Sequence, residues 1–202
     1  DISGHWAEKD ITQWQEKGLI SGYEDGTFKP DNSVTRAEFV IMLNKALGFT
    51  QKGNVTFSDV SANAWYYDAV AIAVEAGYCA GYEDGTFKPN ATITRAEAAV
   101  MIAKAKELTA NTEAADKFTD ASRIPAWARG SVGAVSAAGF MTGRTDGTFD
   151  ATNTITRAEA VSSLDRTMEK EETDEEAKDV VVTEDDTVIE GQTIEGNLII
   201  DK

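Results

Sequence analysis

The sequence predicts a mainly helical protein built from three tandem copies of one helix–loop–helix unit. The tetrapeptide Thr-Arg-Ala-Glu occurs three times, and each copy follows an Asp-Gly-Thr-Phe turn at the same interval. Successive turn aspartates lie 59 and 62 residues apart, and the same two offsets separate three tryptophans. One register therefore governs the chain, and function is to be sought in what each unit does. The aspartates are Asp25, Asp84 and Asp146, and the tryptophans are Trp6, Trp65 and Trp127.

The first helix of each unit is predicted from an apolar stripe. Two apolar positions recur at a three-residue step in all three copies, which is typical of one face of an amphipathic helix. A glycine follows at the same distance in each copy, where a left-handed residue commonly ends a helix. The stripe positions are Ile11, Val70, Val132, Trp14, Ala73 and Val135, and the glycines are Gly18, Gly77 and Gly139.

The loop after this helix is predicted to fold back sharply and to pair as a minimal hairpin. It runs from Ser21 to Pro30 in the first unit and recurs almost unchanged from Gly81 to Pro89. Asp-Gly is a strong turn signal because glycine accepts a positive φ without a Cβ clash. The phenylalanine after each turn is expected to anchor the loop in the core; these residues are Phe28, Phe87 and Phe149.

The second helix is predicted to begin at the repeated tetrapeptide. Threonine at the N-cap and glutamate three residues later form a capping box, which accounts for both residues without any function. The arginine between them lies in the first turn, where the helix dipole disfavours a cation, so a compensating anion is expected. Two alternatives stay open. The anion is internal, from Asp59, Asp120 or a neighbouring loop acid, or it is a ligand held by the guanidinium and the free N–H groups of the helix start.

Composition excludes several classes of protein. The chain carries a net charge of −16, which argues against a nucleic-acid partner, and no apolar run is long enough to span a membrane. The single cysteine, Cys79, is expected to be a small buried residue, and the single histidine, His5, to lie at the surface or at a helix entry. Because Asp1-Ile2 aligns with Asp59-Val60, we expect the first unit to have lost leading residues, and a signal peptide could have preceded it.

Taken together, these motifs resemble the S-layer homology domain of bacterial cell-surface proteins. The resemblance rests on the tryptophan near the first helix, on Gly-Tyr-x-Asp-Gly-Thr-Phe-x-Pro, and on Ile/Val-Thr-Arg-Ala-Glu, over residues 1 to about 170. It implies a pseudo-threefold bundle formed by one chain, with a central three-helix spindle and three helix–loop–helix prongs. It also implies a secreted protein at the cell surface, in the S-layer, that binds secondary cell-wall polysaccharide attached to peptidoglycan.

The resemblance further implies which residues bind the polysaccharide. In the family, grooves between adjacent copies hold a sugar that often carries a ketal pyruvate, such as pyruvylated N-acetylmannosamine, and the motif arginine meets its carboxylate. Carried over, the carboxylate ligands are Arg36, Arg95 and Arg157, and the walls of the sugar sites are Trp6, Trp65 and Trp127. The glycines beside the turns, expected to let the saccharide approach the backbone, are Gly22, Gly81 and Gly143.

The third copy departs from this pattern. Arg144-Thr145 replaces the Tyr-Glu pair of the other loops, and Asp150-Ala151 replaces Lys-Pro. Without the proline that fixes φ, this loop is expected to be less rigid. We therefore expect the third groove to bind weakly or to serve structure alone.

Three other functions are less consistent with the sequence. The acidic loops lack the ligand spacing of a calcium-binding EF-hand, although calcium-dependent assembly of a surface layer stays an alternative. No constellation of catalytic or metal-ligating side chains accompanies the single histidine and cysteine, so we expect no catalysis, metal or cofactor, although the module could target a larger enzyme to the wall. The module is expected to be monomeric, with self-assembly residing outside it.

The expected domain boundaries follow the repeats. The three copies span residues 1–48, 55–110 and 116–170, and a charge run at 171–179 is expected to be an acidic linker or a frayed helix end. Residues 180–202 hold three short β-prone runs and are expected to open a β-rich segment, either a β-solenoid or an immunoglobulin-like module. The runs are Val180–Thr183, Thr187–Glu190 and Asn197–Ile200.

Overall fold

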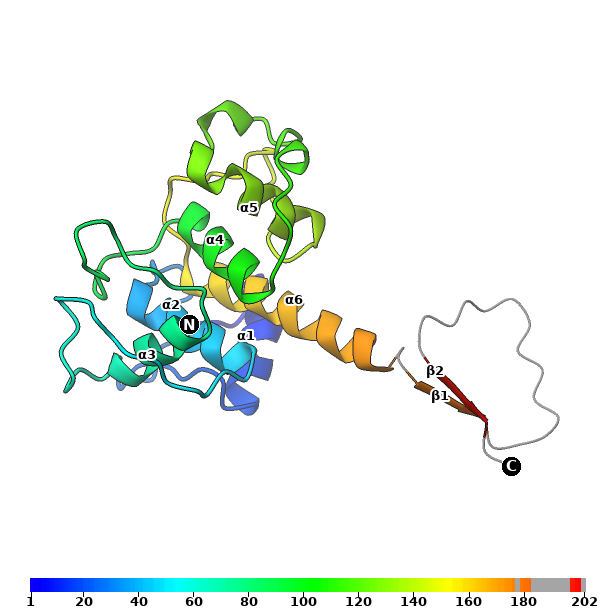
Figure 1. Cartoon of the computed structure of the whole chain (residues 1–202), viewed down its shortest axis with the longest axis horizontal. Helices are drawn as coiled ribbons and strands as arrows, with labels where there is room; N and C mark the ends of the chain where they lie inside the picture. Colours follow the sequence, from blue (N-terminus) through cyan, green and yellow to red (C-terminus); the bar gives the residue numbers. More distant parts are fainter. Residues whose placement is uncertain (177–178, 183–196, 201–202) are drawn as a thin grey trace.

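A computed structural model describes residues 1–176, 179–182 and 197–200 and is mainly helical in this part, which confirms the predicted fold class (Figure 1). Each unit contains a helix, a turn-rich loop and a second helix, as the sequence predicts. The α-helices are α1 (Glu8–Glu16), α2 (Arg36–Ala46), α3 (Tyr67–Glu75), α4 (Arg95–Ala105), α5 (Ala126–Ala137) and α6 (Arg157–Glu176). Two 3₁₀ helices, η1 (Glu113–Ala115) and η2 (Ala121–Arg123), precede α5.

The first helices follow the predicted stripe and the predicted stop. The stripe residues are all buried, and each helix ends two residues before the glycine that terminates it. These glycines have φ of 68° (Gly18), 76° (Gly77) and 78° (Gly139), the left-handed conformation that a side chain disfavours. Local chemistry therefore sets both the buried face and the length of these helices.

Each first helix packs against the second helix of the preceding unit. α3 packs on α2, α5 packs on α4, and α1 returns to pack on α6 at the other end of the chain (Figure 1). The last of these contacts includes a buried hydrogen bond of 2.8 Å from Trp14 Nε1 to Asp165 Oδ1. The three units therefore form a closed ring of contacts rather than an open row.

The starts of the second helices are joined by a cyclic set of backbone hydrogen bonds. The amide of Val34 donates to Ile155 O at 3.0 Å, Ile155 donates to Ile93 O at 3.1 Å, and Ile93 donates to Val34 O at 3.0 Å. All three side chains are buried. This ring fixes the three arginine-bearing helix starts around a common centre.

The Asp-Gly loops fold back as predicted, in all three units. In the first, Tyr23 N donates to Thr27 O at 2.7 Å, and Gly26 adopts φ of 78°. The Asp25 carboxylate accepts hydrogen bonds from the amide and the hydroxyl of Thr27, which closes the turn. The phenylalanines that follow are buried: Phe28, Phe87 and Phe149.

The third loop keeps this shape without its proline, and our expectation that it is less rigid stays a prediction. Arg144 N donates to Thr148 O at 2.7 Å, and Asp150 has φ of 60°, close to the 56° of Lys29 and 57° of Lys88. An ion pair of 2.7 Å between Arg144 Nε and Asp150 Oδ2 ties the loop together. Side-chain bonds thus take over the restraint that proline supplies in the other loops.

The acidic run after the third repeat begins as the end of a helix, one of the two alternatives expected for it. Helix α6 continues through Glu176, and four of residues 171–176 are glutamates, which have high helix propensity. Strands β1 (Asp179–Val182) and β2 (Asn197–Ile200) pair in parallel; β2 matches one predicted β-prone run, and β1 covers residues 180–182 of another. The third run, Thr187–Glu190, lies outside the described residues.

Candidate ligand-binding clefts between the repeats

The three motif arginines are buried and hold the turn of the next repeat. Their exposed fractions are 4% for Arg36, 4% for Arg95 and 5% for Arg157. Each donates a hydrogen bond from Nε to the carbonyl of the phenylalanine that anchors a turn. The acceptors are Phe87 O at 2.8 Å, Phe149 O at 2.8 Å and Phe28 O at 2.9 Å, in the same order. Each arginine therefore clamps a neighbouring repeat.

The internal counter-anions are the capping-box glutamates of the neighbouring repeats. Nη1 of each arginine lies near a carboxylate oxygen, in the pairs Arg36–Glu97 (3.1 Å), Arg95–Glu159 (3.6 Å) and Arg157–Glu38 (3.4 Å). In Glu97 and Glu38 one carboxylate oxygen caps its own helix while the other faces the arginine, whereas Oε2 of Glu159 does both. Oε2 of Glu97, for example, accepts from Thr94 N at 2.9 Å.

The prediction that Asp59 or Asp120 neutralises the arginines is wrong. Asp59 accepts hydrogen bonds from the amides of Phe87 and Lys88, and Asp120 accepts them from the amides that follow the third turn. The backbone of the turn satisfies both carboxylates, because the short aspartate side chain lies directly against it. These aspartates thus position the turns, and the capping-box glutamates form the ion pairs with the arginines.

The helix starts have no free N–H groups for a ligand anion, contrary to the second alternative. The amide of Arg36 donates to Ala91 O at 2.9 Å, and that of Ala37 donates to Pro89 O at 3.0 Å. Glu38 N donates to the Thr35 hydroxyl in the capping box. The same amide bonds recur at the other two helix starts. Only side-chain donors are thus left to meet an anion.

The three repeated tryptophans are exposed to solvent, in contrast to the buried motif arginines. Trp6 is 62% exposed, Trp65 68% and Trp127 62%, and they are the most exposed large apolar side chains in the described part of the chain. Each lies at or just before the start of a first helix. A flat apolar face held out in solvent is suited to stacking against a ligand ring. Their exposure is unexplained by packing.

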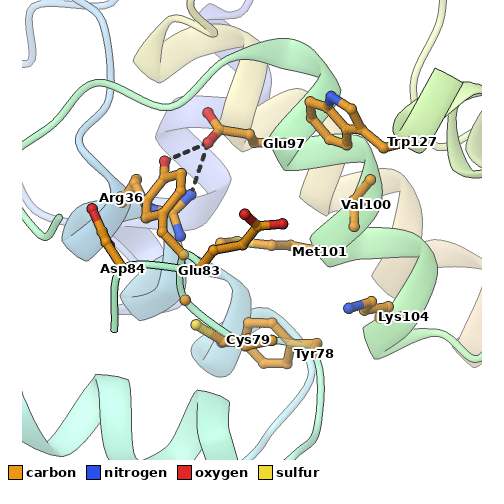
Figure 2. A pocket seen from close by; sticks show the side chains of 13 residues that line it. Arg36, Tyr78, Cys79, Glu83, Asp84, Glu97, Val100, Met101, Lys104 and Trp127 are labelled. Atoms are coloured by element: carbon orange, nitrogen blue, oxygen red, sulfur yellow. Dashed lines mark hydrogen bonds and ion pairs between the residues drawn. The ribbon is translucent and has the colours of Figure 1, made fainter. Parts of the chain in front are cut away.

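One cleft, here named the Arg36 cleft, combines residues of all three repeats. It has a volume of about 630 Å³ and is lined by Arg36 from the first repeat, the segment 78–84 and helix α4 from the second, and Trp127 from the third. Figure 2 shows Trp127 and Glu97 toward one end and Tyr78 and Cys79 toward the other. The cleft therefore depends on the assembled ring.

Arg36 is fixed within this cleft by aromatic and charged neighbours. Its guanidinium lies 4.6 Å from the ring centre of Tyr82, whose hydroxyl donates to Glu97 Oε1 at 2.6 Å. Burial alone would raise the pKa of Glu97, but hydrogen bonds from Thr94 and Tyr82 and the charge of Arg36 outweigh it and hold the pKa below its ordinary value. Glu97 is thus an anion at neutral pH. Nη2 of Arg36 has no hydrogen bond to any described residue, so it is available to a ligand.

A second cleft, here named the Arg95 cleft, is built in the same way around the next arginine. Its volume is about 460 Å³, and it is lined by Arg95, by residues 142–145 of the third turn and by helix α6, with Trp6 of the first repeat at its side. Nη2 of Arg95 is occupied by Thr142 O at 2.9 Å. The third turn, which we expected to accompany a weak groove, forms one wall of this cleft.

The remaining arginine, the remaining tryptophan and the turn glycines differ from the residues described above. Arg157 and Trp65 line neither of these two clefts, and Nη2 of Arg157 donates to Ser21 O at 3.2 Å. The three turn glycines are required by the turn itself. A Cβ on Gly81 would lie 2.8 Å from Thr86 O and still closer to the Phe57 ring, and Gly22 and Gly143 face the equivalent carbonyls. Their role in saccharide binding stays a prediction.

Sequence reasoning missed several lining residues. Tyr82 and Arg144 occupy equivalent positions in the two clefts, and their alignment was visible in the repeat register. One lining residue of α4 and three of α6 were also not predicted, because an apolar stripe shows which helix face is buried but not which face lines a cleft. They are Lys104, Ser162, Ser163 and Arg166.

Other candidate chemistry has structural explanations. Cys79 is buried, and burial raises the pKa of its thiol, as expected for a packed side chain. His5 lies at the entry of α1, where its Nδ1 accepts from Ala7 N. Among residues 1–176, 179–182 and 197–200, no group of three or more His, Cys, Asp or Glu side chains could hold a metal ion. The same residues include no helix that is both long and apolar enough to cross a membrane.

Comparison with known proteins assigns the chain to a family. The model of the S-layer homology domain matches residues 1–40, 56–99 and 117–161. Cell surface glycoprotein 1 of Acetivibrio thermocellus is 32% identical over 170 residues, which cover 77% of this chain and 7% of that protein. The Surface-layer 125 kDa protein of Lysinibacillus sphaericus is 38% identical over 63% of this chain and 11% of its own length. The Cellulosome-anchoring protein of A. thermocellus is 34% identical over 75% of this chain and 36% of its own length.

The matched region is therefore a small part of each of these relatives. The three matches of the family model fall on the three repeats, and each contains one motif arginine and one exposed tryptophan. The chain belongs to the S-layer homology domain family, with three copies of the domain in tandem.

Proposed function

We propose that this chain anchors its protein to the bacterial cell wall, without catalysis, by binding secondary cell-wall polysaccharide in the Arg36 and Arg95 clefts. The observation that carries the proposal is the placement of a largely exposed tryptophan beside a buried arginine in each cleft, with the two residues supplied by different repeats. An indole face and a fixed donor group together suit a sugar ring that bears an acidic substituent.

Recognition in the Arg36 cleft is local. Since Glu97 neutralises Arg36, and the whole chain carries a net charge of −16, an anionic polymer gains no long-range attraction. A carboxylate such as that of a ketal-pyruvylated sugar instead accepts a hydrogen bond from Nη2 of Arg36, while Trp127 packs on the sugar ring. A charged hydrogen bond of this kind contributes about 1.5 to 3 kcal/mol.

Two clefts on one body strengthen retention. The polymer chains are crowded at a wall, so the second contact is made at a high effective concentration. This explains how individually weak sites can hold a protein at the cell surface. An anchoring module of this kind would serve a surface-layer protein and a wall-bound enzyme equally well.

The tryptophans give the cleanest test, because substituting the buried arginines would also disturb the fold. We expect Trp127→Ala and Trp6→Ala each to weaken sedimentation with purified walls about tenfold, or about 1.4 kcal/mol. The double variant should no longer sediment. Trp65→Ala is the matched control, since Trp65 has the same exposure but lines neither cleft, and it should bind as the unmodified chain does.

Two outcomes would contradict the proposal. One is a double variant that still sediments with walls at the concentration that suffices for the unmodified chain. The other is undiminished binding to walls from which mild acid has removed the ketal pyruvate, which would exclude the carboxylate as the group recognised in the Arg36 cleft. Melting temperatures of all variants, measured in parallel, separate loss of binding from loss of fold.

A further inference from the structure

The exposed indole of Trp6 packs against the histidine that precedes it. Trp6 lies at the side of the Arg95 cleft, and its ring centre is 5.3 Å from that of His5, with the two ring planes inclined at 37°. The His5 side chain is itself only 14% exposed. No hydrogen bond joins the indole to a described residue, so its orientation depends on the ring that is packed against it.

Both nitrogens of the His5 ring have partners. The amide of Ala7 donates to Nδ1 at 3.2 Å, and Nε2 lies 3.3 Å from Asp31 Oδ1. Because a backbone amide can only donate, Nδ1 is the acceptor, and Nε2 carries the proton that it donates to Asp31. Rotation of the ring would break both bonds. The imidazole is therefore held in one orientation beneath the indole.

Asp31 belongs to a segment that is bonded to the helix forming the wall of the Arg95 cleft. Next to it, the carbonyl of Asn32 accepts a hydrogen bond of 2.9 Å from the amide of Arg157, the first residue of α6. Helix α6 lines the cleft. His5 thus connects the indole of the first repeat to the wall that the third repeat supplies.

The other two repeats lack both members of the His5–Asp31 pair. An alanine stands before each of the other two repeated tryptophans, and it can neither pack on an indole face nor reach the segment after the turn. The histidine and the aspartate occur together in one repeat, as expected of two residues that act together. The positions equivalent to His5 are Ala64 and Ala126, and those equivalent to Asp31 are Asn90 and Thr152.

From these contacts we propose that His5 is a positioning residue, which presents the Trp6 indole to the sugar ring in the Arg95 cleft. The inference rests on the proposed function and adds to it a residue that does not itself line the cleft. An indole that is already ordered loses less conformational freedom when a ligand stacks on it. His5 therefore raises the affinity of this cleft, by about threefold.

Indole N–H signals in NMR spectra of the whole chain follow each tryptophan separately. His5→Ala installs the residue of the other two repeats. In the ligand-free chain it should lower the heteronuclear NOE of the Trp6 indole, which measures its order, and leave those of Trp65 and Trp127 unchanged. A general loss of stability would not single out Trp6.

Polysaccharide released from purified walls is the probe for binding. We expect half of the Trp6 shift to require about threefold more polysaccharide in His5→Ala than in the unmodified chain. The Trp127 signal, which reports on the Arg36 cleft, should titrate alike in both chains. The same sample thus contains the affected cleft and its control.

A second variant tests the role of the aspartate without touching the core. The Asp31 side chain is 84% exposed, and His5 is its partner, so Asp31→Ala should weaken the Trp6 titration about twofold and leave the fold intact. Glu16→Ala removes an exposed carboxylate at the other end of α1 and should titrate as the unmodified chain does. Should His5→Ala fail to fold, Asp31→Ala decides the matter.

The inference is overturned if the polysaccharide shifts the Trp6 signal in His5→Ala and in Asp31→Ala at the same concentrations as in the unmodified chain. Anchoring would then stand, because the indoles still respond. If no indole of the unmodified chain responds to the polysaccharide, the proposed anchoring role is removed instead. A lower NOE of the Trp6 indole in His5→Ala would in that case still uphold His5 as the residue that positions Trp6.

Discussion

The motif arginines and the repeated tryptophans share one register, yet they lie in opposite environments. Arg36, Arg95 and Arg157 are almost fully buried and bonded to the next repeat, whereas Trp6, Trp65 and Trp127 are more than half exposed. A fourth tryptophan, Trp14, is fully buried. The most recognisable motif of the sequence therefore holds the ring of repeats together, whereas the three repeated tryptophans face solvent.

The largest effect should come from removing an arginine that lines neither cleft. Arg157→Ala leaves the carbonyls of Phe28 and Ser21 without their donor and Glu38 without its cation. Breaking a buried ion pair on one side costs about 3–5 kcal/mol, and we expect the free energy of unfolding in urea to fall by this amount. If the arginine were mainly a ligand residue, the loss would be small.

Two controls frame this measurement. Arg123→Ala removes an exposed guanidinium, and Trp65→Ala removes an exposed indole in the same register as the other tryptophans. Both should change the free energy of unfolding by no more than about 0.5 kcal/mol. Equal stabilities for Arg157→Ala and Arg123→Ala would show that burial of the arginine has no structural purpose.

The next effect compares the buried tryptophan with an exposed one. Trp14→Phe keeps an aromatic ring in the contact of α1 with α6 but removes the donor to Asp165, a carboxylate that is itself buried. Leaving such a group without its hydrogen bond costs about 1–3 kcal/mol. Trp6→Phe should leave the unfolding curve unchanged. A Trp14→Phe variant as stable as Trp6→Phe would mean that the ring does not close through this bond.

Sequence analysis could predict the units and not their arrangement. Glycines such as Gly77, the capping boxes and the Asp-Gly turns act through bonds within a few residues, so the local pattern contains the whole cause. Packing of α1 on α6 joins residues that are 151 positions apart, and an apolar stripe shows which face is buried but not which helix covers it. The residue pattern alone therefore did not predict the ring closure, which only the family resemblance implied.

The same limit applies to the clefts. The repeated arginine predicted an anion, and the open question was its source. For Arg36 the anion is Glu97 of the next repeat. One oxygen of Glu97 caps its own helix, and the other lies against Arg36. Arg144 was recognised as a departure from the pattern. The pattern did not show that Arg144 lines the same cleft as Arg95 and Trp6, because the three residues come together only in the assembled ring.

A smaller effect tests whether the capping box supports the arginine clamp. The hydroxyl of Thr94 accepts from Glu97 N and lies 3.0 Å from Glu97 Oε2, which orients the carboxylate toward Arg36. Thr94→Ala should lower the free energy of unfolding by about 1 kcal/mol. Thr94→Ser keeps the hydroxyl and should recover most of the loss. A serine variant as unstable as the alanine variant would point to the lost methyl group and not to the cap.

The smallest effect concerns the pH dependence of the same clamp. The pKa of Glu97 is held below its ordinary value of 4.5 in the folded chain, so its anion favours the folded state. This contribution is complete above the ordinary pKa and is lost as the pH falls through the folded pKa. Glu97→Gln is uncharged throughout, so its free energy of unfolding should fall less on acidification from about pH 7 to about pH 3 than that of the unmodified chain.

Urea unfolding at several pH values measures this difference, and Glu83→Gln provides the matched control. Glu83 lines the same cleft but is exposed, and no ion pair joins it to a described residue. Its variant should follow the unmodified chain at every pH. The gap between the unmodified chain and Glu97→Gln should narrow toward low pH, because protonation makes the two side chains alike. A difference in unfolding free energy that stays constant or widens would mean that the Glu97 anion does not stabilise the arginine clamp. The hydrogen bond from Arg36 to the carbonyl of Phe87 would then hold the repeats together without it.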